Sequence, residues 1–258
     1  MVEIVPRVHS IDELDHPIPS VGMIPYLIEE KPGDYTLIDT CFACSIPTFE
    51  SYLSKSGIDI KDINRIVLTH LHPDHVEAVN EIKRKTGAKI YSHWIEAVYL
   101  SQELEYNGPP NKDAFEHILK IMGTNIDKVT KEFDNINVGP IITDVLLEDG
   151  DTIGNTLQVI HTPGHTPGHI SLYDKERQIL IGGDIFFNSI LNIDGLFVPP
   201  SIVTKDWNTS IVSARRLLRL KIEKLLLAHQ TNPILENASR MIENAVSVAI
   251  THRNTTAK

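Results

Sequence analysis

Short apolar runs alternate with amphipathic stretches along the chain. The run 63–68 is typical of a buried strand, whereas 76–85 places apolar residues on one face of a helix. The same reading predicts further strands at 2–9, 26–29, 35–38, 88–91, 145–147, 157–160, 170–173, 178–181 and 225–228. It predicts helices at about 45–57, 73–85, 94–104, 115–123, 206–218 and 233–252. Because strand pairs and single helices follow one another in both halves, we predict an α/β fold.

Two pairs of predicted strands are separated by short polar turns. Residues 31–34 read Lys-Pro-Gly-Asp and residues 174–177 read Asp-Lys-Glu-Arg, each between two apolar runs. Such turns between strands are typical of β-hairpins. Asp39 ends the second strand of the first hairpin. We interpret it as a turn residue that caps local backbone rather than as part of a functional site.

The pattern changes between residues 94 and 138. Apolar and aromatic residues at 94–104 and 115–122 indicate two helices, with Pro109-Pro110 as the break between them. We interpret 94–138 as a helical insertion. It could cover an active site as a lid, or it could be a pair of packing helices without substrate contact.

Length and charge narrow the class of protein. A chain of 258 residues can form one large domain or two small ones. The formal net charge of −10 argues against non-specific binding to nucleic acid, which depends on lysine and arginine. No apolar run is long enough to span a membrane, and Met1–Pro6 lacks the features of a signal peptide. We therefore expect a cytoplasmic protein without a membrane or nucleic-acid partner.

Cys41 and Cys44 are the only cysteines of the chain. Their spacing could form a redox pair or half of a zinc site. No second cysteine pair is present to complete a four-thiolate site. We interpret them as small residues that line the loop after a strand.

The strongest chemical signal lies directly after the strand 63–68. Four potential metal ligands occur there within six residues: His70, His72, Asp74 and His75. If the backbone stays extended, the first two histidines point to the same side, because side chains alternate along a strand. Pro73 keeps the residue before it out of helical geometry. The last two ligands then begin a helix and can face a second position, which indicates two adjacent metal ions.

Three more candidate ligands each stand just after a predicted strand. They are His165, Asp184 and His229. Loops at one end of a sheet can converge on one site. Gly164 and the pair Gly182-Gly183 would let the backbone approach something bulky.

These pieces, in this order, resemble the metallo-β-lactamase superfamily. The resemblance rests on His-x-His-x-Asp-His at 70–75, Thr-Pro-Gly-His at 162–165, Gly-Gly-Asp at 182–184 and His229, and it covers about residues 24–229. It implies a single domain over 1–258. It also implies a four-layer αββα sandwich that carries the helical insertion at 94–138.

The resemblance also implies a ligand set. His70, His72 and His165 would hold one metal ion, Asp74, His75 and His229 would hold a second, and Asp184 would bridge them. His161 and His169 stand four residues before and after His165 in a repeated His-Thr-Pro-Gly sequence, outside the motif positions, so we expect them to support the ligands or the fold. With aspartate at position 184, the sequence resembles the glyoxalase II, lactonase and phosphodiesterase branches of the superfamily. His72 argues against the flavodiiron branch, which usually carries glutamate there.

The chemistry implied by this ligand set is hydrolysis. Two divalent metal ions would lower the pKa of a bridging water and give hydroxide at neutral pH. Zinc is the expected metal, and histidine and aspartate also accept iron or manganese. The hydroxide would attack the carbonyl carbon of an ester, a thioester or a lactone in a small-molecule substrate. Asp74 is also a candidate catalytic residue that moves a proton.

Two departures from known branches bear on the substrate. Glyoxalase II enzymes carry a basic helical region near the C-terminus, whereas here a single helix with few basic residues follows His229. Acyl-homoserine lactonases carry a tyrosine shortly after the bridging aspartate, whereas here Ile185-Phe186-Phe187 follows. The two phenylalanines and the region of Trp94 suggest a substrate with an apolar portion.

Several alternatives stay open. A mononuclear-iron oxidoreductase similar to persulfide dioxygenases would use His70, His165 and Asp184. A phosphodiesterase would use the same fold, and a non-enzymatic module would hold metal in a closed site. The oligomeric state is also open, and the insertion could serve a homodimer interface.

Overall fold

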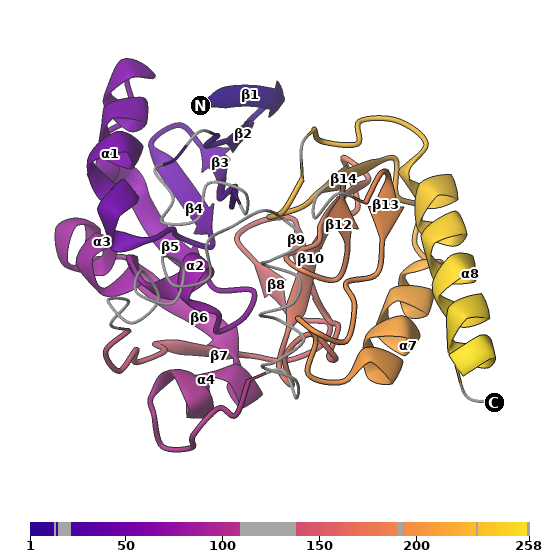
Figure 1. The fold of residues 1–258 in the computed structure, drawn as a ribbon. Helices are drawn as coiled ribbons and strands as arrows, with labels where there is room; N and C mark the ends of the chain where they lie inside the picture. Colours follow the sequence, from indigo (N-terminus) through magenta and orange to yellow (C-terminus); the bar gives the residue numbers. More distant parts are fainter. Residues whose placement is uncertain (13, 15–21, 109–137, 190–192, 231, 257–258) are drawn as a thin grey trace. The chain divides into compact units, whose positions relative to one another are not determined.

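The computed structural model describes residues 1–12, 14, 22–108, 138–189, 193–230 and 232–256. The chain divides into two compact units, shown in Figure 1. The first comprises Met1–Glu105 and Ile126–Leu147, and the second comprises Tyr106–Asn125 and Glu148–Lys258. Each unit contains a mixed sheet and its own helices, which confirms the predicted α/β class. A single domain over 1–258 stays a prediction.

The first unit is built on a sheet of seven strands. In spatial order they are β1 (Val2–Val5), β2 (Val8–Ser10), β3 (Tyr26–Lys31), β4 (Asp34–Ile38), β5 (Ile63–Val67), β6 (Lys89–His93) and β7 (Val145–Leu147). The first four strands pair antiparallel, and β4 to β7 pair parallel. The predicted hairpin at 31–34 is confirmed as the β3–β4 turn, where Gly33 has a φ of +72°.

Helices of the first unit pack on this sheet. They are α1 (Ile46–Lys55), α2 (Pro73–Val76), α3 (Val79–Thr86) and α4 (Trp94–Leu100), with short 3₁₀ turns at Ala43–Ser45 and Ile60–Asp62. Phe49 of α1 and Ile82 of α3 are fully buried in one core cluster with Leu37 and Ile66 of the sheet. α1 and α3 therefore cover one face of the sheet through their apolar stripes (Figure 1).

The single helix predicted for 73–85 is wrong in one respect, because the structure divides it into α2 and α3. The break lies at Glu77 and Ala78. The backbone N–H of Ala78 donates to the carbonyl of Cys41 at 2.9 Å, and a bond to Asp74 would have continued the helix. A contact with a distant loop thus ends α2 after one turn, and that turn carries two of the predicted ligands.

The insertion predicted for 94–138 is described only in part. α4 confirms a helix at its start, and Trp94 is half exposed there. The predicted break at Pro109-Pro110 and the helix at 115–123 lie outside the described residues. The choice between a lid and a packing helix pair stays open.

The second unit is built on a sheet of five strands. In spatial order they are β14 (Lys224–Leu226), β11 (Ile179–Ile181), β10 (Ile170–Asp174), β9 (Leu157–His161) and β8 (Thr152–Ile153). β14 and β11 pair parallel, and the other pairs are antiparallel. The predicted hairpin at 174–177 is confirmed between β10 and β11. A further antiparallel pair, β12 (Phe187–Asn188) and β13 (Leu196–Phe197), follows β11 in the sequence.

Two helices, α7 (Trp207–Leu217) and α8 (Ala238–Thr256), share a core with this sheet (Figure 1). Asp206, the first residue of the helix predicted for 206–218, is the N-cap of α7. The Thr209 backbone N–H donates to its carboxylate at 3.0 Å, and this bond lowers the pKa of Asp206. No helix among the described residues is long and apolar enough to cross a lipid bilayer.

The last helix begins later than predicted. Residues from 233 were expected to be helical, but α8 starts at Ala238. Ile234 instead pairs antiparallel with Leu225 of β14, through backbone hydrogen bonds of 2.7 and 3.1 Å. Pairing with a strand therefore overrides the apolar periodicity at this point.

Candidate metal centre

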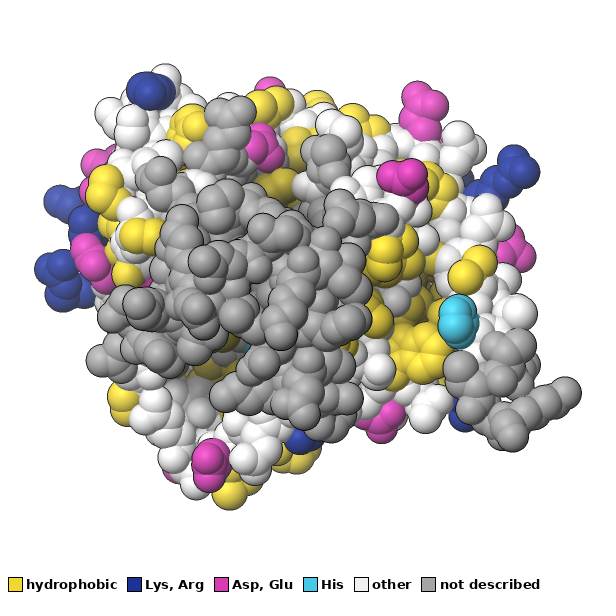
Figure 2. Space-filling view, in the orientation of Figure 1, with side chains coloured by type: hydrophobic (Ala, Val, Ile, Leu, Met, Phe, Trp, Pro, Cys, Tyr) yellow, Lys and Arg dark blue, Asp and Glu magenta, His cyan; other side chains and the backbone are white. Residues whose placement is uncertain are grey.

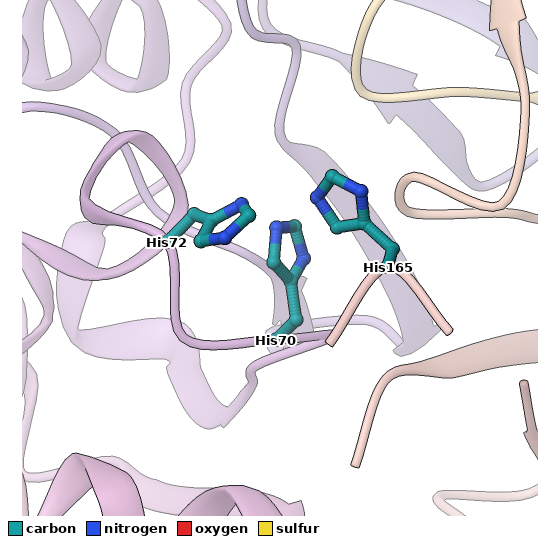
Figure 3. A group of neighbouring side chains, drawn as sticks. All are labelled: His70, His72 and His165. Atoms are coloured by element: carbon teal, nitrogen blue, oxygen red, sulfur yellow. The ribbon is translucent and has the colours of Figure 1, made fainter. Parts of the chain in front are cut away.

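The first four predicted ligands lie at the carboxyl end of β5, in the first unit. His72 has extended backbone angles (φ −65°, ψ 146°), as a residue before proline prefers. The ring centroids of His70 and His72 are 4.7 Å apart, and those of His70 and His75 are 4.0 Å apart. His70 and His75 are fully buried. Figure 3 shows His70 and His72 on the loop after β5, together with His165 on the loop after β9.

Asp74 completes this group on the first turn of α2. One of its carboxylate oxygens lies 3.7 Å from Nε2 of His75. The strand–loop–helix segment therefore gathers all four side chains of the motif, as the sequence predicts. The catalytic role of Asp74 stays a prediction.

Behind these ligands lies the buried carboxylate of Asp39, at the end of β4. One oxygen accepts the backbone N–H of Thr69 at 2.7 Å. The other accepts the Thr69 hydroxyl at 2.7 Å and Nδ1 of His75 at 2.8 Å. The next residue, Thr40, donates its backbone N–H and its hydroxyl to the carbonyl of His75. Asp39 and Thr40 thus fix both the ring and the backbone of one ligand.

The same carboxylate determines the tautomers of two histidines. Nδ1 of His75 must carry a proton, because a carboxylate can only accept. The Thr69 hydroxyl gives its proton to Asp39, so its oxygen accepts Nδ1–H of His70, which is 3.1 Å away. In both rings the nitrogen that would coordinate a metal is therefore Nε2. This carboxylate–histidine arrangement is typical of metal sites, so the donor set fits a metal ion.

The interpretation of Asp39 as a local turn residue is therefore incomplete. Its φ of +58° does place it in the left-handed region, as expected for a turn. Its side chain, however, bonds to residues 30 and 36 positions away along the chain. In the sequence, the signal is an aspartate directly after a predicted strand.

The other three predicted ligands lie together in the second unit. His165 follows β9, Asp184 follows β11 and His229 follows β14, and all three are almost fully buried. One carboxylate oxygen of Asp184 lies 3.3 Å from Nε2 of His165 and 3.5 Å from Nε2 of His229. Two donors bound to one tetrahedral ion at about 2.0–2.1 Å lie roughly 3.3 Å apart. The spacing of these donors therefore also fits metal ligation.

The aromatic ring of Phe187 packs against this group. Its centroid is 5.1 Å from that of His229 and 6.4 Å from that of His165, with nearly perpendicular ring planes in both pairs. Phe187 also packs on Phe197 across the β12–β13 pair. An apolar wall thus adjoins two of the ligands.

The loop that carries His165 is held by α7 and the two residues before it. Three donors of the α7 region bond to consecutive carbonyls of the loop: Ser213 Oγ to Pro163 at 2.6 Å, the Asp206 N–H to Gly164 at 2.8 Å and the Lys205 N–H to His165 at 3.1 Å. Gly164 lies so close to α7 that an added Cβ would be 2.3 Å from the backbone N of Ser210. The glycine expected to allow close approach therefore approaches a helix.

Replacing Gly164 with alanine is expected to destabilise the protein by about 3 kcal/mol. The residue has a φ of +135°, where a side chain is strained, and the methyl group would overlap the backbone of α7. In a chain of this size the melting temperature would fall by roughly 6–12 °C. Calorimetry of the metal-free protein measures this.

Gly150→Ala is the matched control, because Gly150 also has a positive φ of +93° but has no neighbour within 4 Å of an added Cβ. It should cost only about 1 kcal/mol. An equal loss in the two variants would contradict the close contact with α7.

The two cysteines form no disulfide. Cys41 is buried in the core cluster of the first unit, and burial raises the pKa of its thiol to about 12. A thiol with this pKa is protonated at neutral pH, so it is a poor nucleophile and a poor metal ligand. Cys44 is exposed in the short 3₁₀ turn before α1. This agrees with the interpretation of both as loop residues.

Among known proteins, several relatives are similar over most of the chain. The probable metallo-hydrolase YflN of Bacillus subtilis is 27% identical over 213 residues, which cover 78% of this chain and 77% of YflN. The acyl-coenzyme A thioesterase MBLAC2 of Homo sapiens is 28% identical over 74% of this chain and 64% of that protein. The hydroxyacylglutathione hydrolase GloC of Haemophilus influenzae is 27% identical over 63% of this chain and 66% of GloC.

Solved structures share the fold. The metallo-beta-lactamase family protein TTHA1429 from Thermus thermophilus has a TM-score of 0.70 at 21% identity, and the match covers 98% of this chain and 81% of that one. TTHA1623, solved in a di-iron-bound form, has a TM-score of 0.57 at 23% identity, with 85% and 91% of the two chains covered. The predicted metallo-β-lactamase fold, with two mixed sheets flanked by helices, is thereby confirmed.

The family pattern itself spans the motifs described above. The pattern of the metallo-beta-lactamase superfamily matches residues 25–229, from β3 to the last candidate ligand. Within that span, the histidine and aspartate side chains of each unit are of the kind that hold metal in a metallo-hydrolase. This chain belongs to the metallo-β-lactamase superfamily.

Proposed function

We propose that this protein is a hydrolase with two divalent metal ions that cleaves thioesters, or the related esters and lactones. The proposed ligand groups are His70, His72 and His165 for one ion, and Asp74, His75 and His229 for the other, with Asp184 shared. The observation that carries the proposal is that each unit presents its share of this set in a form ready to bind metal. Two histidines of the first unit are fixed with Nε2 as the coordinating atom. In the second unit one carboxylate oxygen stands within 3.5 Å of two imidazole nitrogens.

Two bound metal ions would supply an activated water at neutral pH and would polarise the carbonyl group of the substrate. The protein's own part is to hold the ligands before metal arrives. Asp39 holds His75 and, through the Thr69 hydroxyl, His70. α7 holds the loop of His165. Asp74, which is only partly buried, would ligate the second ion and is our candidate for carrying a proton to the leaving group.

Thioesters are the preferred substrate class for two reasons. Two relatives have names that state thioester or acyl-glutathione hydrolysis, namely MBLAC2 and GloC. In addition, the ring of Phe187 beside His165 and His229 would suit an apolar acyl chain better than a charged group. A lactone or simple ester offers the same carbonyl chemistry and is the next choice.

Phosphodiesters of nucleic acid are a poorer match. The net charge of −10 opposes association with a polyanion. On the face drawn in Figure 2, lysine and arginine side chains of the described residues lie scattered among aspartate and glutamate and form no basic patch. The net charge therefore disfavours a nucleic-acid phosphodiester as the substrate.

The test combines metal analysis with a substrate screen on one purified sample. We expect about two metal ions per chain, and hydrolysis of acyl-coenzyme A or acyl-glutathione thioesters ahead of lactones and phosphodiesters. Stripping with a chelator should remove the activity, and added zinc, manganese or iron should restore it. The control is a stripped sample returned to buffer without metal.

One iron per chain with oxygen uptake would instead support the dioxygenase alternative. Metal binding without turnover of any substrate class would support a non-enzymatic module. Either result would contradict the proposed hydrolase.

A further inference from the structure

His169 ends a second copy of the Thr-Pro-Gly-His sequence that carries His165, but it occupies a different position in the second unit. It is fully buried and directly precedes β10. Its Nε2 lies 3.0 Å from the backbone N of Asp184, and its Nδ1 lies 2.9 Å from the hydroxyl oxygen of Thr162. A backbone N–H can only donate, so Nε2 of His169 must accept. The imidazole is therefore neutral, with its proton on Nδ1.

The direction of the next hydrogen bonds follows from this tautomer. Nδ1–H of His169 donates to the Thr162 hydroxyl, which lies 3.1 Å from the Ser171 hydroxyl. The Ser171 hydroxyl donates to the carbonyl of Gly182 at 3.0 Å, so its oxygen accepts the Thr162 proton. This series of hydrogen bonds thus connects the backbone N–H of Asp184 to the backbone carbonyl of Gly182, two residues earlier. Its three side chains are fully buried, so water cannot replace them.

The turn between the two ends of this series of hydrogen bonds has no side chain of its own to hold it. It consists of Gly182 and Gly183, and Gly183 has a φ of +56°. An added Cβ at Gly182 would lie 2.6 Å from Leu227, so the turn is pressed against the end of β14. Glycine backbone is free to adopt many conformations. Backbone bonds hold the two glycines, from the Gly182 N–H to the Leu226 carbonyl at 2.8 Å and from the Ala228 N–H to the Gly183 carbonyl at 3.5 Å. The bond from Asp184 to His169 adds a side-chain contact that fixes the backbone of the aspartate itself.

We propose that His169 is a positioning residue that sets the place of Asp184 toward the metal ions by accepting its backbone N–H. This rests on the proposed role of Asp184 as a shared metal ligand. The carboxylate oxygen of Asp184 must stay within about half an ångström of its place to serve two ions. A rotation at the two glycines would carry it away from His165 and His229.

Two substitutions separate the acceptor from the rest of the imidazole. His169→Gln places an amide oxygen near the position of Nε2, so it can still accept the N–H of Asp184. His169→Asn places its amide near Nδ1, so it can still donate to Thr162 but cannot reach Asp184. We expect His169→Asn to weaken metal binding about 10–100-fold, and His169→Gln to retain most of the affinity.

The measurement is zinc affinity of the full chain by competition with a chromophoric chelator, alongside thermal unfolding of the metal-free proteins. His252→Asn is the matched control, since His252 is an exposed histidine of the same unit and lies on α8. Its metal affinity should equal that of the unsubstituted protein. If His169→Asn does not fold, Thr162→Val tests the same idea. It removes the acceptor of the His169 Nδ1–H and so favours the tautomer with the proton on Nε2, which cannot accept the N–H of Asp184. Zinc binding should therefore weaken as in His169→Asn.

The outcomes distinguish this inference from the proposed function. Equal losses in His169→Asn and His169→Gln, or unchanged affinity in both, would overturn the positioning role alone. Unchanged affinity in Thr162→Val would do the same. An unsubstituted protein that binds no zinc would overturn the metal centre itself, and the inference with it.

Discussion

Replacing Asp184 with alanine is expected to remove hydrolysis and most of the bound metal while the fold is retained. The carboxylate lies within 3.5 Å of one nitrogen on each of two candidate ligands, so its loss affects both proposed ions. We expect the fall in kcat/KM to exceed the roughly 10–100-fold that substitution of a residue behind a ligand costs. Steady-state kinetics and metal analysis on the same sample measure the two effects.

The control for this prediction is Asp194→Asn, which removes an exposed carboxylate from the same unit. Its activity and metal content should match those of the unsubstituted protein. Circular dichroism of both variants establishes that each is folded. Unchanged hydrolysis by a folded Asp184→Ala protein would contradict a mechanism that uses two metal ions.

Replacing Asp39 with asparagine is expected to weaken metal binding about 10–100-fold, although Asp39 is not itself a ligand. The asparagine oxygen can still accept the N–H of Thr69. Its NH₂ group, however, would face Nδ1 of His75, where it can only donate. The ring would then carry its proton on Nε2, the atom that would coordinate the metal. The tautomer change lowers metal affinity even if the ring does not move.

The same substitution should destabilise the metal-free protein by about 3 kcal/mol, because it breaks a buried, charged hydrogen-bond network. Chelator competition and thermal unfolding measure the two effects. Glu81→Gln is the control, since it removes a carboxylate of α3 whose partner Lys85 is 3.4 Å away at the surface. That pair contributes only about 0–1 kcal/mol. Normal metal affinity in a folded Asp39→Asn protein would show that the carboxylate does not determine the tautomer.

Local features of the fold were predictable from the sequence. The apolar run before His70, the proline after His72 and the helix that follows are all local signals, and the first four ligands lie on the loop after β5 and on α2 as predicted. The two hairpins were likewise encoded in their turns. The Asp206 cap of α7 needed only its own neighbours.

Features that depend on distant partners were not predictable. α2 ends because Ala78 bonds to Cys41, and α8 starts late because Ile234 pairs with Leu225. Asp39 was assigned to a local turn because its hydrogen bonds cross at least 30 residues of sequence. Each of these contacts exists only once the sheet has brought separate segments together.

The Asp39 network also bears on how the protein acquires its metal. In the first unit, folding alone fixes the rings and the protons of two candidate ligands. Little conformational entropy remains to be lost there when an ion enters. One ion could then be exchanged for another without unfolding of this unit. The metal present in the working enzyme would thus depend on the supply of ions in its surroundings as well as on the preferences of its ligands.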